Sequence, residues 1–456
     1  MSSATLLAIC SQACLAQTQP APASTVPAAD VRQLLDAKQY DAAVAQARQQ
    51  LAAAEQQPGP GGDYLQVALM NLALAQYFDE DYVGAEDSYL RVIKLIEDSG
   101  RRTTARLARA QAGLATTYYA GKRYDLAAAR YEQAIALVRR EQGLFTEEQL
   151  PYLEKYASAL TELDRVSDAL KVRRYILRTV ERKYGASSVQ YAQALESAGR
   201  WLMHVGSYDA ARTALRQSIG IIEGQKGENA GELIGPLTAL GECARLQLLD
   251  PSSMAPSPDQ PPRPMFGESL PMVTTAMSAT SVTSDGQRSL ERAVAIATQL
   301  DPPSPAQVAD TRTLLGDWYQ SRQLPDKAAA NYELAWRAAG TATVAGRQLT
   351  DLLFGKPVLI AYVPPTAATR FASRSPDEVV VRNVEVRFTV TSRGRVADAK
   401  VLEDAGDPSH GTSVQRALQT AIYRPRFENG VAVDTPGVTL DQRFYVLVDE
   451  DKSTDK

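Results

Sequence analysis

The chain has 456 residues, of which 45% are hydrophobic and 22% are charged, and its formal net charge is -4. Enough apolar residues are present to build a buried core. The small negative charge gives no electrostatic reason to expect nucleic acid or an anionic membrane as a partner, so basic-patch binding proteins are disfavoured.

The first residues have the layout of a secretory signal peptide. An apolar run from Ala4 to Ile9 precedes a small residue at Ala16, and a tail rich in Gln, Pro and Ala follows. This order predicts a signal at residues 1–16, cleaved after Ala16, and a flexible tail at 17–29. The run is far shorter than the ~18 residues needed to span a bilayer, so we expect export without a membrane-spanning segment.

Two alternatives concern this same region. The positive charges usual at the start of a signal are missing, which leaves open a true start codon further upstream. A lipoprotein signal at Cys10 is the weaker alternative, because the bulky Ile9 precedes the cysteine. Export would remove Cys10 and Cys14 and leave Cys243, which excludes an intrachain disulfide and predicts a small buried hydrophobic residue.

A Tyr-Asp-x-Ala motif recurs after this region, as QYDAA, DYVGA, RYDLA, RVSDA and SYDAA. The alanines that close the groups are 42 residues apart: Ala43, Ala85, Ala127, Ala169 and Ala211. A second series of small residues shares this spacing: Ala73, Ala115, Ala157, Gly199 and Gly241. Apolar residues recur at helical intervals between them, so each unit is predicted to be a helix, a turn and a helix. Small residues suit the points where two helices cross at ~8 to 10 Å.

The same pattern is clearest at residues 314–335, LLGDWYQSRQLPDKAAANYELA, with Gly316, Tyr319, Ala328, Tyr332 and Ala335. It resembles the tetratricopeptide repeat (TPR), and the longer period is similar to arrays of the kinesin-light-chain type. The resemblance implies a mainly α protein, with an α-solenoid of about seven repeats over residues 30–345. A Pro/Ser/Met-rich stretch at 250–286 has no period and is predicted to be a mobile insertion in the sixth repeat.

From about residue 357 the pattern changes to that of a small α+β domain. PVLIAYVPP predicts one strand, and Val384, Val386, Phe388 and Val390 alternate with polar residues before a Ser-Arg-Gly turn. A helix is predicted from Ser413 to Tyr423. The motif YRPRF, an Asn-Gly turn and a last antiparallel strand at 442–449 follow it.

This order of elements, with YRPRF followed by Asn429-Gly430, resembles the C-terminal domain of TonB proteins over residues 357–449. The resemblance implies that the domain binds a partner by adding a strand to an exposed sheet edge. Pro425 would end the helix, and Arg424 and Arg426 would keep the polar face of the strand in water. The simpler interpretation is that this motif marks a turn and that its two arginines are solvated cations. The alternative is that they lie on a sheet edge that contacts a partner.

Motifs for nucleotide binding, metalloprotease chemistry and cysteine-ligated zinc are absent from the sequence. The two histidines, His204 and His410, lie in a repeat helix and in a Gly/Pro/Ser loop, which is a poor setting for nucleophilic catalysis. We therefore expect no enzyme, no catalytic residues, no cofactor and no metal.

The TPR resemblance implies that the first helix of each repeat lines a protein-binding groove. In this register, the groove residues are Tyr77, Arg109, Thr116, Tyr119, Arg200 and His204. Tyrosine and arginine offer contact area and hydrogen bonds to a partner. The lysine and asparagine set of the chaperone-type carboxylate clamp does not align, because only Asn71 falls near a matching position.

Together these patterns and resemblances predict a periplasmic protein-protein interaction adaptor of a Gram-negative bacterium. Its groove would bind one protein or peptide, and its TonB-C-like module would dock by strand addition to another, such as an outer-membrane receptor or another envelope protein. An accessory component of TonB-dependent transport is one alternative. An envelope hydrolase with an unrecognised site is another.

Overall fold

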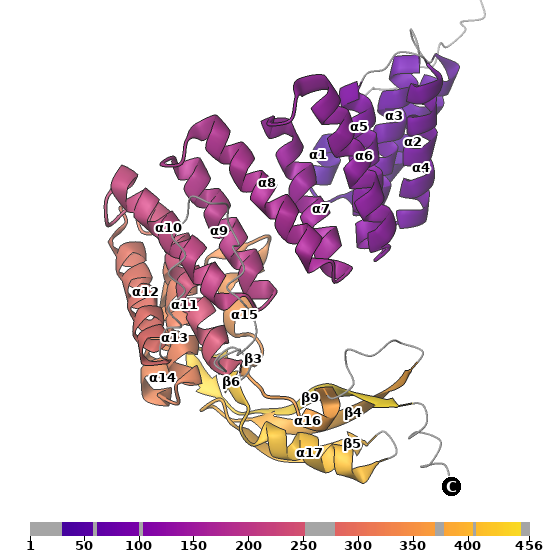
Figure 1. The fold of residues 1–456 in the computed structure, drawn as a ribbon. Coiled ribbons are helices and arrows are strands. Elements are labelled where there is room, and N and C mark those ends of the chain that lie inside the picture. Colours follow the sequence, from indigo (N-terminus) through magenta and orange to yellow (C-terminus); the bar gives the residue numbers. More distant parts are fainter. Residues whose placement is uncertain are drawn as a thin grey trace, which may run out of the picture. The chain divides into compact units, whose positions relative to one another are not determined.

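The computed structural model describes residues 30–57, 62–99, 104–250, 279–369, 378–404 and 407–447. The signal peptide and tail predicted for residues 1–29 lie outside these ranges. Residues up to Ala169 form one compact unit and residues from Leu170 onward form a second. Each unit is described by itself (Figure 1).

The first unit consists of helices (Figure 1), and each of them packs against the next one in the chain. They are α1 (Val31–Asp36), α2 (Tyr40–Gln56), α3 (Asp63–Phe78), α4 (Tyr82–Asp98), α5 (Thr104–Ala120), α6 (Tyr124–Gln142) and α7 (Leu150–Glu162). Helix α8 (Val166–Tyr184) begins at the end of this unit and continues into the second.

The second unit continues the helical array. Its helices after α8 are α9 (Val189–His204), α10 (Tyr208–Lys226), α11 (Ile234–Leu249), α12 (Ala279–Gln299), α13 (Pro305–Ser321) and α14 (Pro325–Ala339). Counted in chain order over the described residues, the helices α1 to α14 make seven helix-turn-helix units. The predicted helical repeat array is therefore confirmed.

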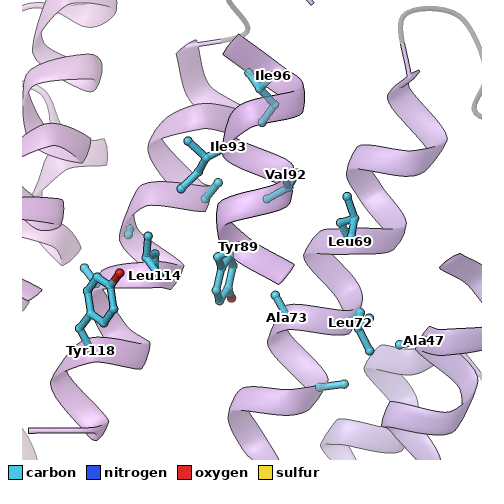
Figure 2. Close-up of a cluster of buried hydrophobic side chains, with 14 of the residues drawn as sticks. Ala47, Leu69, Leu72, Ala73, Tyr89, Val92, Ile93, Ile96, Leu114 and Tyr118 are labelled. Carbon is cyan, nitrogen blue, oxygen red and sulfur yellow. The ribbon is translucent and has the colours of Figure 1, made fainter. Parts of the chain in front are cut away.

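The predicted small residues lie where the helices meet. All five alanines of the 42-residue series have no exposed surface. The glycines of the other series have bulky partners: a Cβ added at Gly199 would lie 2.8 Å from the Leu215 side chain, and one at Gly241 would lie 2.3 Å from the Leu290 side chain. Figure 2 shows the larger apolar side chains, including Leu69, Tyr89 and Leu114, that fill the space between these contacts.

The turns inside the hairpins follow the same 42-residue period as the buried alanines. Lys38, Glu80, Lys122, Asp164 and Gly206 are 42 residues apart, and all have positive φ. The next amide donates back to a carbonyl five residues earlier, as Asp81 N does to Gln76 O at 2.9 Å. This is the Schellman closure of a helix, which satisfies carbonyls that the helix end leaves without partners.

Replacing Ala127 by leucine is expected to lower the free energy of unfolding by about 1–3 kcal/mol, because three added carbons must enter a filled helix crossing. Ala129 lies two residues further along α6 and is exposed, so Ala129→Leu serves as a matched control with a change within about 0.5 kcal/mol. Chemical denaturation followed by circular dichroism measures both changes. Equal effects of the two substitutions would contradict the assigned role of the small residue.

The insertion predicted at 250–286 overlaps the start of helix α12. Residues 251–278 lie outside the described ranges, but residues 279–286 form the start of α12, although this helix was predicted to resume only near Arg288. Val282 is fully buried, and a Cβ at Gly286 would lie 2.5 Å from the Trp318 ring. Residues 279–286 therefore already pack against α11 and α13, although their polar composition does not suggest it.

A small region with antiparallel strands follows the array, as predicted. Its elements are β1 (Thr343–Val344), β2 (Arg347–Gln348), α15 (Leu349–Phe354), β3 (Val358–Ala361), α16 (Thr366–Thr369), β4 (Val379–Val390), β5 (Val396–Glu403), α17 (Pro408–Leu418), β6 (Ile422–Arg424), β7 (Arg426–Glu428), β8 (Val431–Val433) and β9 (Thr435–Leu447). We call residues 357–447 the C-terminal module.

The main sheet of the module has the order β5-β4-β9, and β3-β6 and β7-β8 form two smaller antiparallel pairs. Helix α17 packs on β4 and β5. As the alternation predicted, Val384, Val386, Phe388 and Val390 are buried, and they form a core with Val414 and Leu418 of α17. Asn429 and Gly430 both have positive φ and close the β7-β8 hairpin, as the Asn-Gly turn predicted.

Three boundaries differ from the prediction. Helix α17 spans Pro408–Leu418 rather than 413–423, since Asp407 caps its start by accepting from Ser409 N at 2.8 Å. The last strand begins at Thr435, because β9 pairs with β4 along its length. The residues between 345 and 357 also fold, with Phe354 of α15 fully buried.

Candidate functional site

The second unit contains a groove of about 520 Å³ beside helix α9. Its lining comes from α9 and from one residue of α8: Arg173, Gln193, Glu196, Ser197, Arg200, Trp201 and His204. The α9 residues 193, 197, 200 and 204 recur at helical spacing, so a single face of the helix supplies most of the lining.

The positive charge of the groove comes from two arginines with different surroundings. The side chain of Arg200 is 51% exposed; its Nη2 lies 2.9 Å from Glu196 Oε1 and also donates to Gly235 O at 3.0 Å. Arg173 is buried, and its Nη1 donates to Ser197 Oγ at 3.4 Å. The guanidinium of Arg173 also lies 5.8 Å from the centre of the Trp201 ring.

These contacts hold the groove lining in place from several sides. Glu196 is paired with Arg200 and packs against the start of α11, since a Cβ at Gly235 would lie 2.7 Å from its Oε1. The lining thus contains two arginines and one carboxylate, that of Glu196. Trp201 and His204 line the same groove. Such a lining can accept a carboxylate by charge-assisted hydrogen bonds. Trp201 is 8% exposed, so only a small part of its ring can contact an apolar side chain of a ligand.

The structure thus brings together two of the residues predicted to line a groove, Arg200 and His204. The other four lie in the first unit, on α3 and α5. Arg109 is exposed there, whereas Thr116 is half-buried and shares a hydrogen bond of 2.8 Å with the Tyr131 hydroxyl.

Tyr77 and Tyr119 are half-buried. The ring of Tyr77 lies 6.1 Å from that of Tyr82, and the ring of Tyr119 lies 5.2 Å from that of Tyr124. Burial raises the pKa of both phenols, and Glu162 raises that of Tyr119 further. Both tyrosines thus take part in the packing at the hairpin turns.

Arg424 does not lie on a solvated strand face, which corrects the prediction. It is 9% exposed, and its guanidinium pairs with Asp317 of α13 at 2.7 Å. Arg426, two residues later, is half-buried and pairs with Glu428 at 2.5 Å. The polypeptide breaks into β6 and β7 at Pro425, so the two arginines do not share one continuous strand.

The sequence analysis missed Arg173, Gln193, Glu196, Ser197 and Trp201. Gln193, Glu196 and Ser197 of α9 could have been found by extending the helical spacing back from Arg200. Trp201 was not recognisable, because its apolar ring in an amphipathic helix is typical of a core residue. Arg173 lies on another helix, and its sequence context does not indicate its position.

A stripe of exposed apolar residues occupies the equivalent face of α3. Tyr64, Val67, Leu74 and Phe78 are between 39% and 64% exposed. Val67, Leu74 and Phe78 lie three repeat periods, or 126 residues, before Gln193, Arg200 and His204. The same helix face therefore carries different chemistry in different repeats.

The other titratable groups single out no further site. His410 lies in the first turn of α17, not in a loop as predicted, and its ring stacks on Phe444 at 4.2 Å. Among the described residues, no group of three or more His, Cys, Asp or Glu side chains could hold a metal ion. No helix in the described ranges is long and apolar enough to cross a membrane.

Cys243 is buried, as predicted, and burial raises the pKa of its thiol from 9.0 to about 12. The protonated form is thus favoured by folding, so this stabilisation is fully present below pH 9 and is lost as the pH rises from about 9 to about 12.

At pH 8 we expect iodoacetamide to modify folded Cys243 at least about 100-fold more slowly than the unfolded chain, because thiolate is the reactive form. Mass spectrometry of a Cys10→Ser, Cys14→Ser variant measures the rate. Equal rates with and without denaturant would contradict a buried thiol.

No protein-family model and no curated protein matches this chain. Solved structures that resemble it include TPR-like repeats of a kinesin light chain from Podospora anserina, with 16% identity over 43% of this chain and 93% of that one and a TM-score of 0.39. BtubC (BKLC) from P. vanneervenii has 17% identity over 70% of this chain and 95% of that one, with a TM-score of 0.34. The quorum sensor NprR from B. thuringiensis has 12% identity over 68% and 85%, with a TM-score of 0.37. The repeat architecture of the present chain is established by its own helices.

Proposed function

We propose that this protein is a binding adaptor, and that the groove beside α9 holds an acidic segment of a partner protein. The observation that carries the proposal is the gathering of Arg173, Arg200, Trp201 and His204 around one groove. A partner carboxylate would pair with the exposed guanidinium of Arg200. An adjacent apolar side chain would rest on Trp201.

The charge balance of the groove favours an acidic ligand over a basic one. Glu196 is the only carboxylate in its lining, and it is already paired with Arg200. A lysine from a partner would therefore meet two arginines and compete with Arg200 for Glu196. Like-charge contacts of this kind exclude wrong partners.

Selection of peptides from a random display library on the full-length protein tests this function. We expect enriched peptides to contain Asp or Glu beside an aromatic or aliphatic residue, and to lose binding when the acids become amides. Enrichment of sequences without acidic residues, or binding that survives the amide substitutions, would overturn the acidic specificity. Failure to enrich any sequence would count against peptide binding itself.

The proposal includes a second binding surface on the C-terminal module. Within the described residues, β9 pairs with β4 alone, which leaves its other side as a sheet edge. Edges of this kind accept an added strand, and the resemblance to TonB C-terminal domains supports that mode of docking. The YRPRF motif contacts the array through Arg424 and Phe427. The outer side of β9 is therefore a better candidate for strand addition than that motif.

Hydrogen exchange tests strand addition directly. A partner that binds in this way should slow amide exchange across residues 435–447, while α17 remains unchanged. Protection confined to α17 or to the groove of α9 would contradict the strand-addition mode.

The same proposal places the adaptor in the periplasm, on the basis of the signal-like residues 4–16. Fusing residues 1–29 to a phosphatase that is active only after export checks this placement. An inactive fusion would remove the periplasm from the proposal, and the groove would be unaffected.

A further inference from the structure

The last hairpin of the array, α13 and α14, is in contact with the C-terminal module through a continuous apolar cluster. Trp318 and Tyr332 of the hairpin, Phe354 of α15 and Phe427 of β7 belong to this cluster. The ring of Phe427 stacks on Trp336 of α14 at 6.0 Å, with an angle of 21° between the planes. These aromatic contacts would all be exposed to water if the module moved away.

A buried ion pair lies beside this cluster. Arg424 Nε and Nη2 donate to the two carboxylate oxygens of Asp317, at 2.9 and 2.7 Å. Both side chains are only 11% exposed. Arg424 Nη1 donates to Leu353 O at 2.7 Å, and the Tyr332 hydroxyl donates to Asp317 Oδ1 at 2.9 Å. Arg424 thus donates three hydrogen bonds and Asp317 accepts three, and the two bonds between them join β6 of the module to α13 of the array.

Two polar side chains of the array donate three further hydrogen bonds to backbone carbonyls of the module. Gln320 of α13 donates to Arg393 O at 2.7 Å and to Tyr423 O at 3.2 Å. Arg245 of α11 donates to Ile360 O at 2.6 Å. A Cβ at Gly394 would lie 2.0 Å from Tyr423 O and 2.4 Å from Gln320 Nε2. Only glycine fits this approach, and its φ of 72° suits glycine as well.

Arrays of helical hairpins need such coverage at their ends. Each repeat buries its apolar face against the next, so the last repeat has an uncovered face unless a cap is present. Here α13 and α14 are followed not by another helix pair but by α15 and the module.

We propose that the C-terminal module is the cap of the helical array of the second unit, and that the YRPRF segment, which spans β6 and β7, is the clasp that holds it there. The partner of this surface is the last hairpin of the same chain. Tyr423 anchors the clasp in the module core, whereas Arg424 and Phe427 reach the array. The cap and the array should then form one body that remains together without the peptide link between them.

Cutting that link in the full-length protein tests the proposal. The β1-β2 turn at Ala345-Gly346 is exposed, so the recognition sequence of a specific protease can be inserted there. After cleavage, we expect both fragments to elute together in size-exclusion chromatography at micromolar concentration. They should remain together in 0.5 M salt, because buried charges are screened far less than exposed ones. Separation of the wild-type fragments would overturn the proposal.

The two arginines of the motif supply a matched pair of variants. Arg424→Ala should weaken association of the cut fragments roughly 100- to 1,000-fold, since it leaves the buried carboxylate of Asp317 without its counter-ion. Arg426→Ala should leave association nearly unchanged. Equal behaviour of the two variants would overturn the role of Arg424 as the clasp.

A third variant separates loss of the clasp from misfolding. Replacing both partners by apolar residues, Asp317→Leu with Arg424→Met, removes the stranded charge and should restore much of the association that Arg424→Ala loses. If the double variant dissociates as readily as Arg424→Ala while its helix content is unchanged, the ion pair is not what the cap depends on. None of the substituted residues lines the groove beside α9, so ligand binding there gives an independent readout.

Discussion

Replacing Asp317 by alanine is expected to lower the free energy of unfolding of residues 170–456 by about 3–5 kcal/mol. The substitution leaves Arg424 buried with its charge, and the Tyr332 hydroxyl loses its acceptor. Burial alone would lower the pKa of Arg424, but Asp317 more than offsets this and the pKa is raised. In the variant this offset is gone, but the ordinary pKa of arginine lies so far above neutral pH that the guanidinium keeps its proton and remains a buried charge.

Tryptophan fluorescence during urea denaturation measures this loss. All three tryptophans, Trp201, Trp318 and Trp336, lie after Leu170, so the signal reports on the second unit alone. Glu333→Ala is the matched control, because Glu333 and Arg337 form an ion pair on α14 whose side chains are at least half exposed. Exposed pairs of this kind contribute about 0–1 kcal/mol.

A double-mutant cycle shows whether the loss belongs to the pair. Asp317→Leu and Arg424→Met should each destabilise the unit strongly, and their combination should cost much less than the sum. Additive changes, within about 0.5 kcal/mol, would mean that the two side chains do not interact.

Arg424 also marks the limit of inference from the sequence. Two arginines separated by one residue in YRPRF lie on one face if the strand is continuous, and an exposed face is the usual place for both. The partner that makes burial of Arg424 possible is Asp317, 107 residues earlier. No local pattern reports such a pairing, because it depends on how the module meets the array.

The array itself was readable because its constraints are local and repeated. Ala43 and its equivalents must be small in every repeat, so one steric rule appears at five positions with constant spacing. The left-handed turn residues obey the same period, but four of the five are Lys, Glu and Asp rather than glycine. The residue types at these positions therefore did not indicate a left-handed conformation, although their 42-residue spacing would have done so.

The groove shows an intermediate case. Arg200 and His204 were predicted because the TPR resemblance places the first helix of each repeat along a groove, and both lie on such a helix. The contribution of Arg173 comes from α8, and that of Glu196 depends on the close approach of Gly235 in α11. The face was therefore predictable, whereas its charge balance and its depth required the packed structure.

Reversing the charge of Arg200 is expected to weaken binding of an acidic peptide about 10- to 100-fold or more. One charge-assisted hydrogen bond contributes about 1.5–3 kcal/mol, and the introduced glutamate adds repulsion beside Glu196. The fold should survive, because Arg200 is half exposed and forms an i,i+4 pair on the surface of α9, although the Glu196 side chain is itself 21% exposed. Fluorescence anisotropy with a labelled peptide from the selection measures the change.

Arg337→Glu is the control for this substitution. Like Arg200, Arg337 is an exposed arginine paired with a glutamate four residues before it, but it lies outside the groove. Equal losses in Arg200→Glu and Arg337→Glu would indicate a general effect of net charge, which 0.5 M salt would largely remove. A loss confined to Arg200→Glu assigns the carboxylate of the ligand to the groove beside α9, because net charge, helix context and the paired glutamate are the same in both variants.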